Sequence, residues 1–411
     1  MRILVFNTLY EPDMGPSAPL FASLCKELVR LGHDVIAVVP VPHFPTGKVS
    51  KEFRGRLFWR SVEQGVHVIR VGIPSLDRSK LPLRFIQFIC YQLGAAWIIM
   101  SQKYDVVLSG SPSISGLLPF AVSVAIPNKP AIYAVNDLYP QVGITLGFFR
   151  NKFVIAVVAA LEKFMLNHAT IVQIISESFR AGLHELGVPD SKIILFYNWI
   201  DTDAIHPLPR SNEFSKEHGL EDRFVVLYAG NIGPSQGLES VLEAAAKLQD
   251  EKDILFVLIG DGLNKKSLVE EAEKRAIKNV LFLPFQPRAR LSEVMASANL
   301  SLVPLRKGID KGSLPSKLLT VLASGRPVLA CVEEDSEMWR WVERANAGIR
   351  VPPEDPEELR KAILTLKRDE QKGRQLGENG RSWAEKNHSI QSAAKMMEAL
   401  LSQAREIKRS R

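Results

Sequence analysis

The chain has 411 residues, of which 46% are hydrophobic and 24% are charged. This composition excludes a disordered chain, a collagen-like fibre and a small disulfide-stapled protein, and at about 150 residues per domain the length predicts two or three domains. Three widely separated cysteines, Cys25, Cys90 and Cys331, match no zinc spacing and indicate a reducing compartment. No cleavable signal layout opens the sequence, so we expect a cytoplasmic protein.

Positive charge is concentrated in the first half of the chain. Residues 1–200 hold 19 Lys and Arg against 13 Asp and Glu, whereas the remainder holds 33 against 32. Residues 48–84 alone hold nine basic and three acidic side chains, which suits an anionic membrane or a phosphorylated ligand, although a solvated surface is the simpler interpretation. No basic and aromatic interleaving of an RNA-binding type occurs, so we expect no nucleic acid partner. The nine basic residues are Lys48, Lys51, Arg54, Arg56, Arg60, Arg70, Arg78, Lys80 and Arg84.

The first 200 residues alternate short apolar runs with amphipathic stretches. The apolar runs predict strands, and the amphipathic stretches, including 18–31 and 153–167, predict helices between them. Strands separated by helices form parallel sheets whose crossovers cover both faces. Gly32 follows the helix at 18–31, and glycine is typical of a helix C-terminus. The predicted strands are 3–7, 35–40, 67–71, 106–109, 131–135, 171–175 and 193–196.

The same alternation begins again after a polar, proline-containing stretch at 201–222, which we interpret as a linker. A helix is predicted at 238–248, and the charged stretch 356–409 is also predicted to be helical. The sequence therefore predicts an α/β protein with two Rossmann-like, doubly wound parallel sheets that face a central cleft. The second set of strands is predicted at 225–229, 255–259, 280–282, 300–303 and 327–330. The predicted domains are 1–200, 201–385 and a C-terminal helix at 386–411 that packs back on the first domain.

Two apolar segments raise the question of a membrane. Residues 85–102 are uncharged and reach the lower length limit of a spanning helix. Because this run contains Gln87 and Gln92 and leads directly into a predicted parallel strand, we interpret it as a buried crossover helix. The second run, 153–161, is too short to span. A monotopic contact through residues 48–84 and their apolar neighbours stays open.

Glycine turns follow several predicted strands. The first strand leads through Gly15 and Ser17 into a helix, without a GxGxxG dinucleotide fingerprint, and a tight turn with a serine cap explains this loop equally well. The first strand of the second set leads into Gly230, Gly233 and Gly237, which permit a phosphate to approach the backbone. Because this loop lacks the lysine of a P-loop, a kinase or NTPase is a weak interpretation.

Two further segments of the second half complete a candidate anion site. Residues 260–262 form a Gly-Asp-Gly turn after a strand, and Ser316 with Lys317 begins a helix after a Gly/Ser/Pro turn. Helix N-terminal amides and a lysine both favour a bound anion. A single lysine at a helix start is usually just solvated, but together with several glycine turns it favours a diphosphate site.

With these motifs the chain resembles, over nearly its whole length, the retaining, nucleotide-sugar-dependent glycosyltransferases of family 4, which have a GT-B fold of two Rossmann domains. It looks closest to the branch that transfers N-acetylated deoxyamino sugars, such as N-acetyl-L-fucosamine, in bacterial surface polysaccharide and O-antigen assembly. Each motif is weak alone, whereas their order and spacing are specific. The motifs are Gly15–Ser17 and the segments 42–48, 136–140, 197–201, 228–231, 236–238, 260–262, 315–317 and 325–327.

This resemblance implies a transferase with two substrates and no cofactor. A nucleoside-diphosphate sugar, with UDP as the expected nucleotide, binds mainly the C-terminal domain, and a lipid-linked saccharide acceptor docks on the N-terminal domain. Transfer retains the anomeric configuration and needs no metal. The residues that the resemblance assigns to the donor are Gly15, Ser17, Gly230, Asn231, Gln236, Gly260, Asp261, Phe285, Pro315, Ser316, Lys317, Leu318, Thr320 and Glu337.

Catalytic roles are expected for two residues. Lys317 stabilises the negative charge that develops on the departing diphosphate. Asp137, at the end of a predicted strand, orients the acceptor or receives its proton, although a turn or N-cap role explains it equally well. Glu337 is expected to bind hydroxyl groups of the donor sugar, with a charged helix surface as the alternative.

The sequence departs from the family at the donor site. Many members hold the diphosphate with an Arg and a Lys on the loop that corresponds to 230–237, where this chain has uncharged residues such as Gln236. A glutamate pair near the nucleotide is replaced here by Gly312 and Thr320, although the Thr320 hydroxyl still suits a ribose contact. Positive charge must then come from Lys317, together with Arg306, Lys307 or Lys311.

Two other classes of protein stay open at this point. A GT-B epimerase would act on the same UDP-sugar without an acceptor, and a non-catalytic GT-B partner protein would keep the fold without the glutamate pair. We favour the transferase, located in the cytoplasm or peripherally on the inner face of the cell membrane, where lipid-linked acceptors are available.

Overall fold

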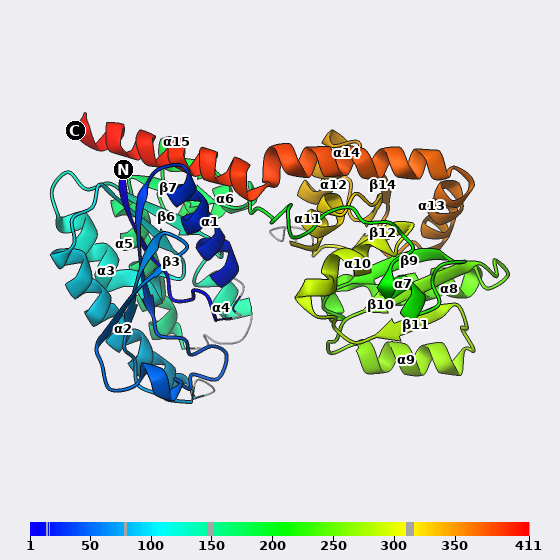
Figure 1. Cartoon of the computed structure of the whole chain (residues 1–411), viewed down its shortest axis with the longest axis horizontal. Coiled ribbons are helices and arrows are strands. Elements are labelled where there is room, and N and C mark those ends of the chain that lie inside the picture. Colours follow the sequence, from blue (N-terminus) through cyan, green and yellow to red (C-terminus); the bar gives the residue numbers. More distant parts are fainter. Residues whose placement is uncertain (14, 16, 78–79, 146–150, 310–315, 411) are drawn as a thin grey trace. The chain divides into compact units, whose positions relative to one another are not determined.

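The computed structural model describes residues 1–411 apart from 14, 16, 78–79, 146–150, 310–315 and 411. The chain forms two compact units (Figure 1). Residues 1–198 and 393–411 make the first unit, and residues 199–392 make the second.

The first unit contains an eight-stranded sheet with the order β3-β4-β2-β1-β5-β6-β7-β8. All neighbouring strands are parallel except β3 and β4, which form an antiparallel hairpin. The seven strands predicted in this half are present with small shifts at their ends. The bounds of all eight strands are β1 Arg2–Phe6, β2 Asp34–Pro40, β3 Phe58–Glu63, β4 Val66–Val71, β5 Val106–Gly110, β6 Ala131–Val135, β7 Ile171–Ile174 and β8 Ile193–Leu195.

Strand β3 was not predicted, because its exposed and polar residues give no apolar run. The signal that identifies it is the following Gln64-Gly65 pair, in which both residues have positive φ, 50° and 84°. Two such residues form the tight turn whose twist matches a hairpin, so they pair β3 with β4.

Helices cover both faces of this sheet. Helix α3 packs between α2 and α5, and these three helices form one hydrophobic core with the sheet. Helix α1 contacts β2 and β4 but is not part of this core. The glycine predicted to end the first helix does so: Gly32 has φ 88°, and the amide of His33 returns to the carbonyl of Leu28. The helices are α1 Ala18–Arg30, η1 Lys51–Phe53, α2 Leu81–Ser101, α3 Ser113–Ala125, α4 Gln141–Thr145, α5 Lys152–His168, α6 Phe179–Glu185 and η2 Asp190–Lys192.

The second unit contains a six-stranded parallel sheet with the order β11-β10-β9-β12-β13-β14. Its strands are continuous apolar runs because helices bury both faces. The short strand β14 was missed since its partly buried residues give no clear pattern. The bounds are β9 Phe224–Ala229, β10 Ile254–Ile259, β11 Val280–Leu283, β12 Leu300–Pro304, β13 Val328–Cys331 and β14 Gly348–Val351.

The helices after β8 connect these strands, and the last of them, α15, leaves the second unit. The segment interpreted as a linker holds one helical turn, α7, capped by Asn212. The helices are α7 Glu213–Glu217, η3 Pro234–Gln236, α8 Leu238–Lys247, α9 Lys265–Lys274, η4 Arg288–Arg290, α10 Leu291–Ala296, α11 Ser316–Ala323, α12 Glu337–Arg344, α13 Pro356–Arg368, α14 Glu370–His388 and α15 Ile390–Arg409.

Helix α15 carries the chain back to the first unit. Its Glu398 carboxylate lies 2.8 Å from His33 Nε2, and Arg405 lies 3.8 Å from Asp105. Residues 393–411 therefore belong to the first unit although they follow the second in the sequence.

The prediction that 85–102 is a buried crossover helix is only half right. Helix α2 does connect β4 to β5 and packs on the sheet and α3. However, Pro82–Ser101 is long and apolar enough to cross a membrane, and only 33% of its most apolar window is buried. The uncharged outer face of the helix is exposed, so low charge in this sequence does not signify burial.

Candidate active site

The carboxyl edge of the second sheet, where its parallel strands end, brings the predicted glycine turns together. Strands β9 and β10 pair with Ala229 opposite Ile259, so Gly230 and Gly260 leave their strands side by side. A Cβ built on Gly260 would lie 1.8 Å from the Gly230 carbonyl oxygen, and Gly260 and Gly230 both have positive φ, 148° and 153°. Only glycine permits this contact between the two turns.

Lys317, in the first turn of α11, reaches this pair of turns. A Cβ built on Gly230 would lie 3.6 Å from Lys317 Nζ. Lys317 Nζ donates to Tyr228 Oη at 3.0 Å and to Gln236 Oε1, and it lies 4.6 Å from the centre of the Tyr228 ring. The Tyr228 hydroxyl in turn donates to the Asn231 carbonyl at 2.5 Å. The structure thus brings together Gly230, Asn231, Gln236 and Lys317 of the predicted donor site.

The electrostatics of Lys317 set it apart from an ordinary surface lysine. Burial lowers the pKa of its ammonium from 10.5 to about 8. Its partners Tyr228 and Gln236 are neutral, and among the described residues no Asp or Glu forms an ion pair with it. A desolvated ammonium without a carboxylate is unfavourable in the free protein and is stabilised by a bound anion. This turn is therefore suited to a phosphate group.

Tyr228 is a site residue that sequence reasoning missed. Its side chain is fully buried, and it positions Lys317 through both its hydroxyl and its ring. The available signal was an aromatic residue with a polar tip on a central strand, two positions before a glycine turn. Lys265 was also missed: its Nζ donates to the carbonyls of Gly260 at 2.7 Å and Leu283 at 3.2 Å at the same edge.

Arg306 and Lys307, two other basic residues considered for this site, are less suited to it. Arg306 pairs with Glu239 at 3.0 Å and with Glu354 at 3.4 Å, so its charge is already compensated. Lys307 is exposed, and Lys311 lies outside the described residues. Of the proposed cations that the structure describes, Lys317 is therefore the best placed.

The other predicted donor residues of the second unit lie on the loops and helices that follow β10, β11, β12 and β13. Asp261 accepts from the Gly262 amide at 2.8 Å. Phe285, beyond β11, is 58% exposed. Leu318 is buried in the unit, so only its backbone amide is available to a ligand. Two others, Thr320 on α11 and Glu337 at the start of α12, are half-buried.

Ser316 is the first residue of α11, whose N-terminal amides are the groups expected to face an anion. Pro315 lies outside the described residues, as does Gly312.

In the first unit, the loops after β1 and β2 are joined at the carboxyl edge. Gly15 is buried, and Ser17 occupies the N-cap of α1 without a side-chain cap hydrogen bond. Asp13, which the sequence did not single out, accepts from the amides of His43 and Phe44, both at 2.9 Å. This buried carboxylate fixes the loop that follows β2 against the loop that holds Gly15.

Asp137 follows β6 at the same edge of the first sheet. The neighbouring amide of Asn136 donates to Ser111 Oγ at 3.0 Å, which fixes the start of the loop. Solvent reaches the Asp137 side chain, yet desolvation by the surrounding protein raises the pKa of its carboxyl. A carboxylate with a raised pKa is better suited to accept a proton. Each unit thus presents its candidate residues at its own carboxyl edge.

The basic stretch 48–84 is only in part an exposed basic surface. Arg70 is 5% exposed and pairs with Glu63 at 2.9 Å, and its guanidinium also donates to the Glu11 carbonyl. Arg84 is half-buried, and Arg78 lies outside the described residues. The exposed basic residues are Lys48, Lys51, Arg54, Arg56, Arg60 and Lys80.

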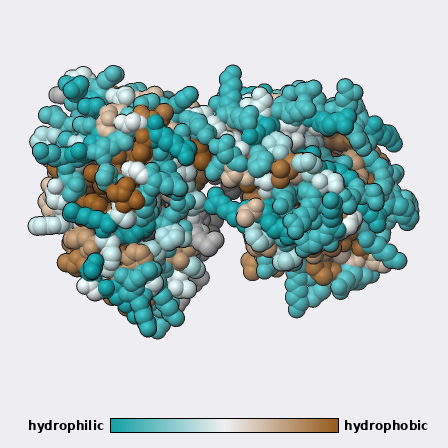
Figure 2. Space-filling model, viewed as in Figure 1, coloured by the Kyte–Doolittle hydropathy of each residue, from teal (hydrophilic) through white to brown (hydrophobic). Residues whose placement is uncertain are grey.

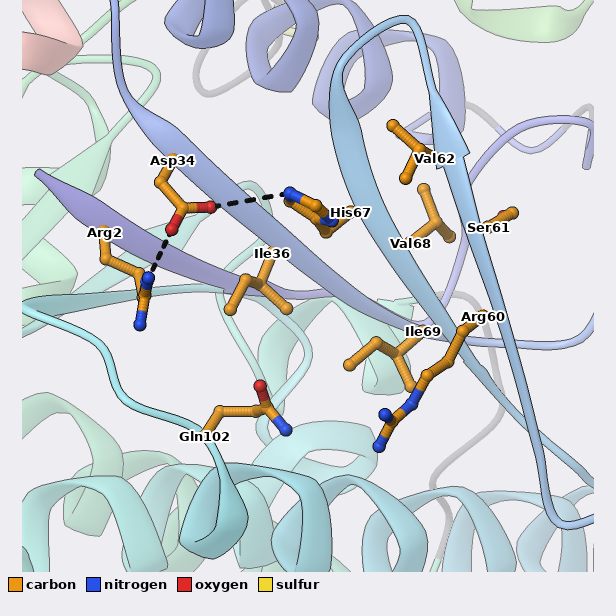
Figure 3. Close-up of a pocket in the computed structure, with 10 residues that line it drawn as sticks. All are labelled: Arg2, Asp34, Ile36, Arg60, Ser61, Val62, His67, Val68, Ile69 and Gln102. Atoms are coloured by element: carbon orange, nitrogen blue, oxygen red, sulfur yellow. Dashed lines mark hydrogen bonds and ion pairs between the residues drawn. The ribbon is translucent and has the colours of Figure 1, made fainter.

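A hollow of about 460 Å³ lies at the opposite edge of the first sheet (Figure 3). The Asp34 carboxylate accepts a hydrogen bond from Arg2 Nε at 2.5 Å and lies 3.9 Å from His67 Nε2. Asp34, Arg2 and His67 lie near the starts of β2, β1 and β4, respectively. Ligands of open parallel sheets bind at the carboxyl ends of strands. We therefore do not assign this hollow to catalysis.

Matches to protein families agree with this geometry. Residues 17–199 match the family described as a glycosyl transferase 4-like domain, and residues 210–383 match glycosyl transferases group 1. Together the two matches include most of the chain. The protein therefore belongs to the GT-B glycosyltransferases, with two Rossmann-like units.

Individual relatives are distant in sequence. The putative colanic acid biosynthesis glycosyl transferase WcaI of Escherichia coli is 25% identical over 381 residues, which cover 89% of this chain and 93% of WcaI. Sucrose-phosphate synthase from Thermosynechococcus elongatus has a TM-score of 0.70 at 17% identity, and the match covers 98% of each chain. Anabaena Alr3699/HepE, crystallised with UDP, has a TM-score of 0.68 at 18% identity over 98% of this chain and 100% of that chain.

Proposed function

We propose that the protein transfers a sugar from a UDP-linked donor to a lipid-linked saccharide, with retention of configuration, in the assembly of a surface polysaccharide. The observation that carries the proposal is Lys317, whose desolvated ammonium has neutral partners and faces the Gly230 turn. A diphosphate supplies the negative charge that this ammonium lacks.

The names of relatives support the substrate classes. WcaI is named for colanic acid biosynthesis, and HepE binds UDP in its crystals. These substrates are consistent with the glycine turns and the desolvated lysine of the second unit. The resemblance to transferases of N-acetylated deoxyamino sugars leads us to propose a sugar of that class, such as N-acetyl-L-fucosamine.

The chemistry follows from the charges on the two units. The bond between the anomeric carbon and the diphosphate oxygen breaks, and the oxygen keeps the electron pair. Lys317 and the first amides of α11 stabilise the resulting charge. The acceptor hydroxyl forms the new bond to the anomeric carbon, and we propose that its proton passes to the Asp137 carboxylate.

The decisive experiment measures UDP release from UDP-linked N-acetylated deoxyamino sugars, with and without a lipid-linked saccharide. A transferase releases UDP and forms a longer glycolipid only when the acceptor is present. Release without an acceptor indicates an epimerase or hydrolase. If UDP does not raise the melting temperature in a thermal shift assay, the result would favour a non-catalytic GT-B protein.

UDP affinity is expected to fall as the pH rises through about 8, the pKa of free Lys317. Below that pH the ammonium is already formed, so this group adds no pH dependence. Above it, binding must take up a proton, because a diphosphate raises the lysine pKa, and affinity falls by up to about tenfold per pH unit. Calorimetric titration between pH 6.5 and 9.5 measures this, with Lys317→Arg as the control that does not titrate. A constant affinity across this range would contradict the assignment.

Activity is expected to persist in EDTA. Among the described residues no group of three or more His, Cys, Asp or Glu side chains is arranged to hold a metal ion. We propose that Lys317 and backbone amides replace the metal in stabilising the diphosphate. Turnover is measured in EDTA and after addition of Mg²⁺ or Mn²⁺. Loss of activity in EDTA with recovery on either metal would show that this prediction is wrong.

We also propose that the first unit docks on the inner face of the cell membrane. Its exposed basic residues include Arg54, Arg56 and Arg60. Each such residue near an anionic bilayer contributes about 1 kcal/mol, screened by salt. Replacing the three arginines by glutamine is expected to reduce sedimentation with vesicles rich in phosphatidylglycerol at low salt by at least about tenfold. Equal sedimentation of this variant and the wild type would exclude these arginines from docking.

A further inference from the structure

Helix α2 of the first unit exposes a continuous apolar stripe. Between residues 82 and 100 every exposed position is apolar, and neighbouring positions are three or four residues apart, which places them on one helix face. The large side chains of this stripe are 45% to 63% exposed. The exposed residues are Pro82, Ile86, Ile89, Leu93, Trp97 and Met100.

Two polar side chains in the middle of α2 point inward instead. Gln87 is 2% exposed and donates to the carbonyls of Gly47 and Pro74. Tyr91 is buried and donates to the Val38 carbonyl at 2.8 Å. The helix is therefore amphipathic in the reverse sense of a helix on a water-facing surface. Because these inner hydrogen bonds join α2 to strands and loops of the unit, the helix cannot cross a membrane while this fold is intact.

Exposed apolar residues also occur on α3, which packs against α2, and on α5, which packs against α3. Phe153 is 76% exposed and Val157 is 41% exposed on α5, and Leu118 is 36% exposed on α3, which packs between α2 and α5. Of the sixteen large hydrophobic side chains exposed among the described residues, nine lie on these three helices. Figure 2 shows hydrophobic residues, in brown, on the surface of this unit.

The charge that the three helices themselves present to solvent has one sign. Their single acidic residue, Glu162, is 1% exposed, so they present no carboxylate to solvent. Exposed Lys80 and Lys103 stand before and after α2, and exposed Lys152 begins α5. An apolar surface with lysines at its border matches a bilayer whose headgroups are anionic, since the lysines reach the headgroups while the apolar residues enter the acyl boundary.

We propose that the α2 stripe, extended by the start of α5, is an interfacial surface that inserts into the headgroup layer of an anionic membrane. The proposal deepens the proposed function, because the acceptor of that function is lipid-linked. Helix α2 begins at the carboxyl edge of the sheet, and Arg84 lies in its first turn. Burial and the nearby Asp137 carboxylate raise the pKa of the Tyr139 phenol, whereas the Arg84 guanidinium is close enough to lower it. The docking surface thus begins beside the loop that carries Asp137.

The test is sedimentation of the full chain with vesicles of phosphatidylethanolamine and phosphatidylglycerol at 0.1 and 0.5 M salt, with phosphatidylcholine vesicles as the neutral reference. The double variant Leu93→Ser with Trp97→Ser is expected to lose at least about tenfold in partition coefficient at both salt concentrations. Leu263→Ser is the matched control, because Leu263 is 89% exposed on the second unit. Equal partition of the double variant and the control would overturn the proposal.

A second readout shows whether the stripe enters the lipid. Trp97 is 63% exposed, so anionic vesicles are expected to shift the emission of the wild type to the blue and brominated lipids to quench it. Trp97→Phe should remove most of this change and keep vesicle binding. A change that persists in Trp97→Phe would overturn insertion at this helix.

Two further outcomes distinguish membrane insertion from self-association and from failure of the transferase function. A concentration-dependent dimer that the Leu93→Ser, Trp97→Ser variant abolishes, without vesicle binding by the wild type, would show that a second copy covers the stripe and would overturn the proposal. The thermal shift caused by UDP reports on the second unit and is expected to be equal in the wild type and in the α2 variants. A loss of vesicle binding with an intact UDP response therefore leaves the proposed function standing.

Discussion

Lys317→Ala is expected to lower kcat/KM by about 30- to 1,000-fold, which corresponds to about 2–4 kcal/mol of transition-state stabilisation. The charge of the departing diphosphate is greater than that of the bound donor, so the loss should appear mainly in kcat. Steady-state kinetics with a UDP-sugar and a lipid-linked acceptor measure it. Lys307→Ala is the matched control, since Lys307 is an exposed lysine on the neighbouring loop. Wild-type turnover in the Lys317→Ala variant would exclude Lys317 from catalysis.

The same site is expected to be a source of instability in the free enzyme. Because burial lowers the pKa of Lys317 from 10.5 to about 8, its charged form opposes folding at pH 7. Lys317→Met keeps the aliphatic stem, so it should raise the free energy of unfolding by about 1–3 kcal/mol at neutral pH while activity is lost. The gain should diminish as the pH rises above 8, where the native lysine becomes neutral. This dependence distinguishes relief of a buried charge from improved packing.

The fold was largely predictable because buried parallel strands have continuous apolar sequences. Strands such as β10 and β6 have this pattern, and both were predicted. Strand β3 was not, because an edge strand with exposed polar residues owes its pairing to the turn at Gln64-Gly65 rather than to hydrophobicity. Burial of α2 was also overestimated from the sequence. An uncharged apolar run is compatible with a helix in the protein core and with a helix whose apolar face is exposed at the surface, so the run alone does not distinguish the two.

The candidate site was predictable only as a set of loops. Glycine turns and a lysine at a helix start indicated an anion, and the structure places Lys317 against Gly230. The sequence could not show that Tyr228, from the strand itself, holds the lysine, nor that Arg306 is compensated by Glu239. Partners of this kind are far apart in sequence, and strand register decides which of them meet.

Of the glycine-to-alanine substitutions in the second unit, Gly260→Ala is expected to lower the free energy of unfolding most. The added Cβ would lie 1.8 Å from the Gly230 carbonyl oxygen, a backbone atom that cannot move without displacing the turn beside Lys317. Residue 260 also has φ 148°, a conformation that side chains disfavour. We expect a loss of about 3 kcal/mol or more in the free energy of unfolding, measured by urea denaturation.

The matched control for this steric effect is Gly219→Ala. Gly219 has φ 63°, and a Cβ there would meet nothing within 4 Å, so only the cost of the left-handed backbone, about 1 kcal/mol, is expected. If enough Gly260→Ala protein folds, its UDP affinity should also fall. The Gly230 carbonyl must move away from the added Cβ, and this movement changes the position of the Gly230 turn relative to Lys317. Equal destabilisation by the two substitutions would contradict the close contact between the Gly230 and Gly260 turns, on which the geometry of the diphosphate site depends.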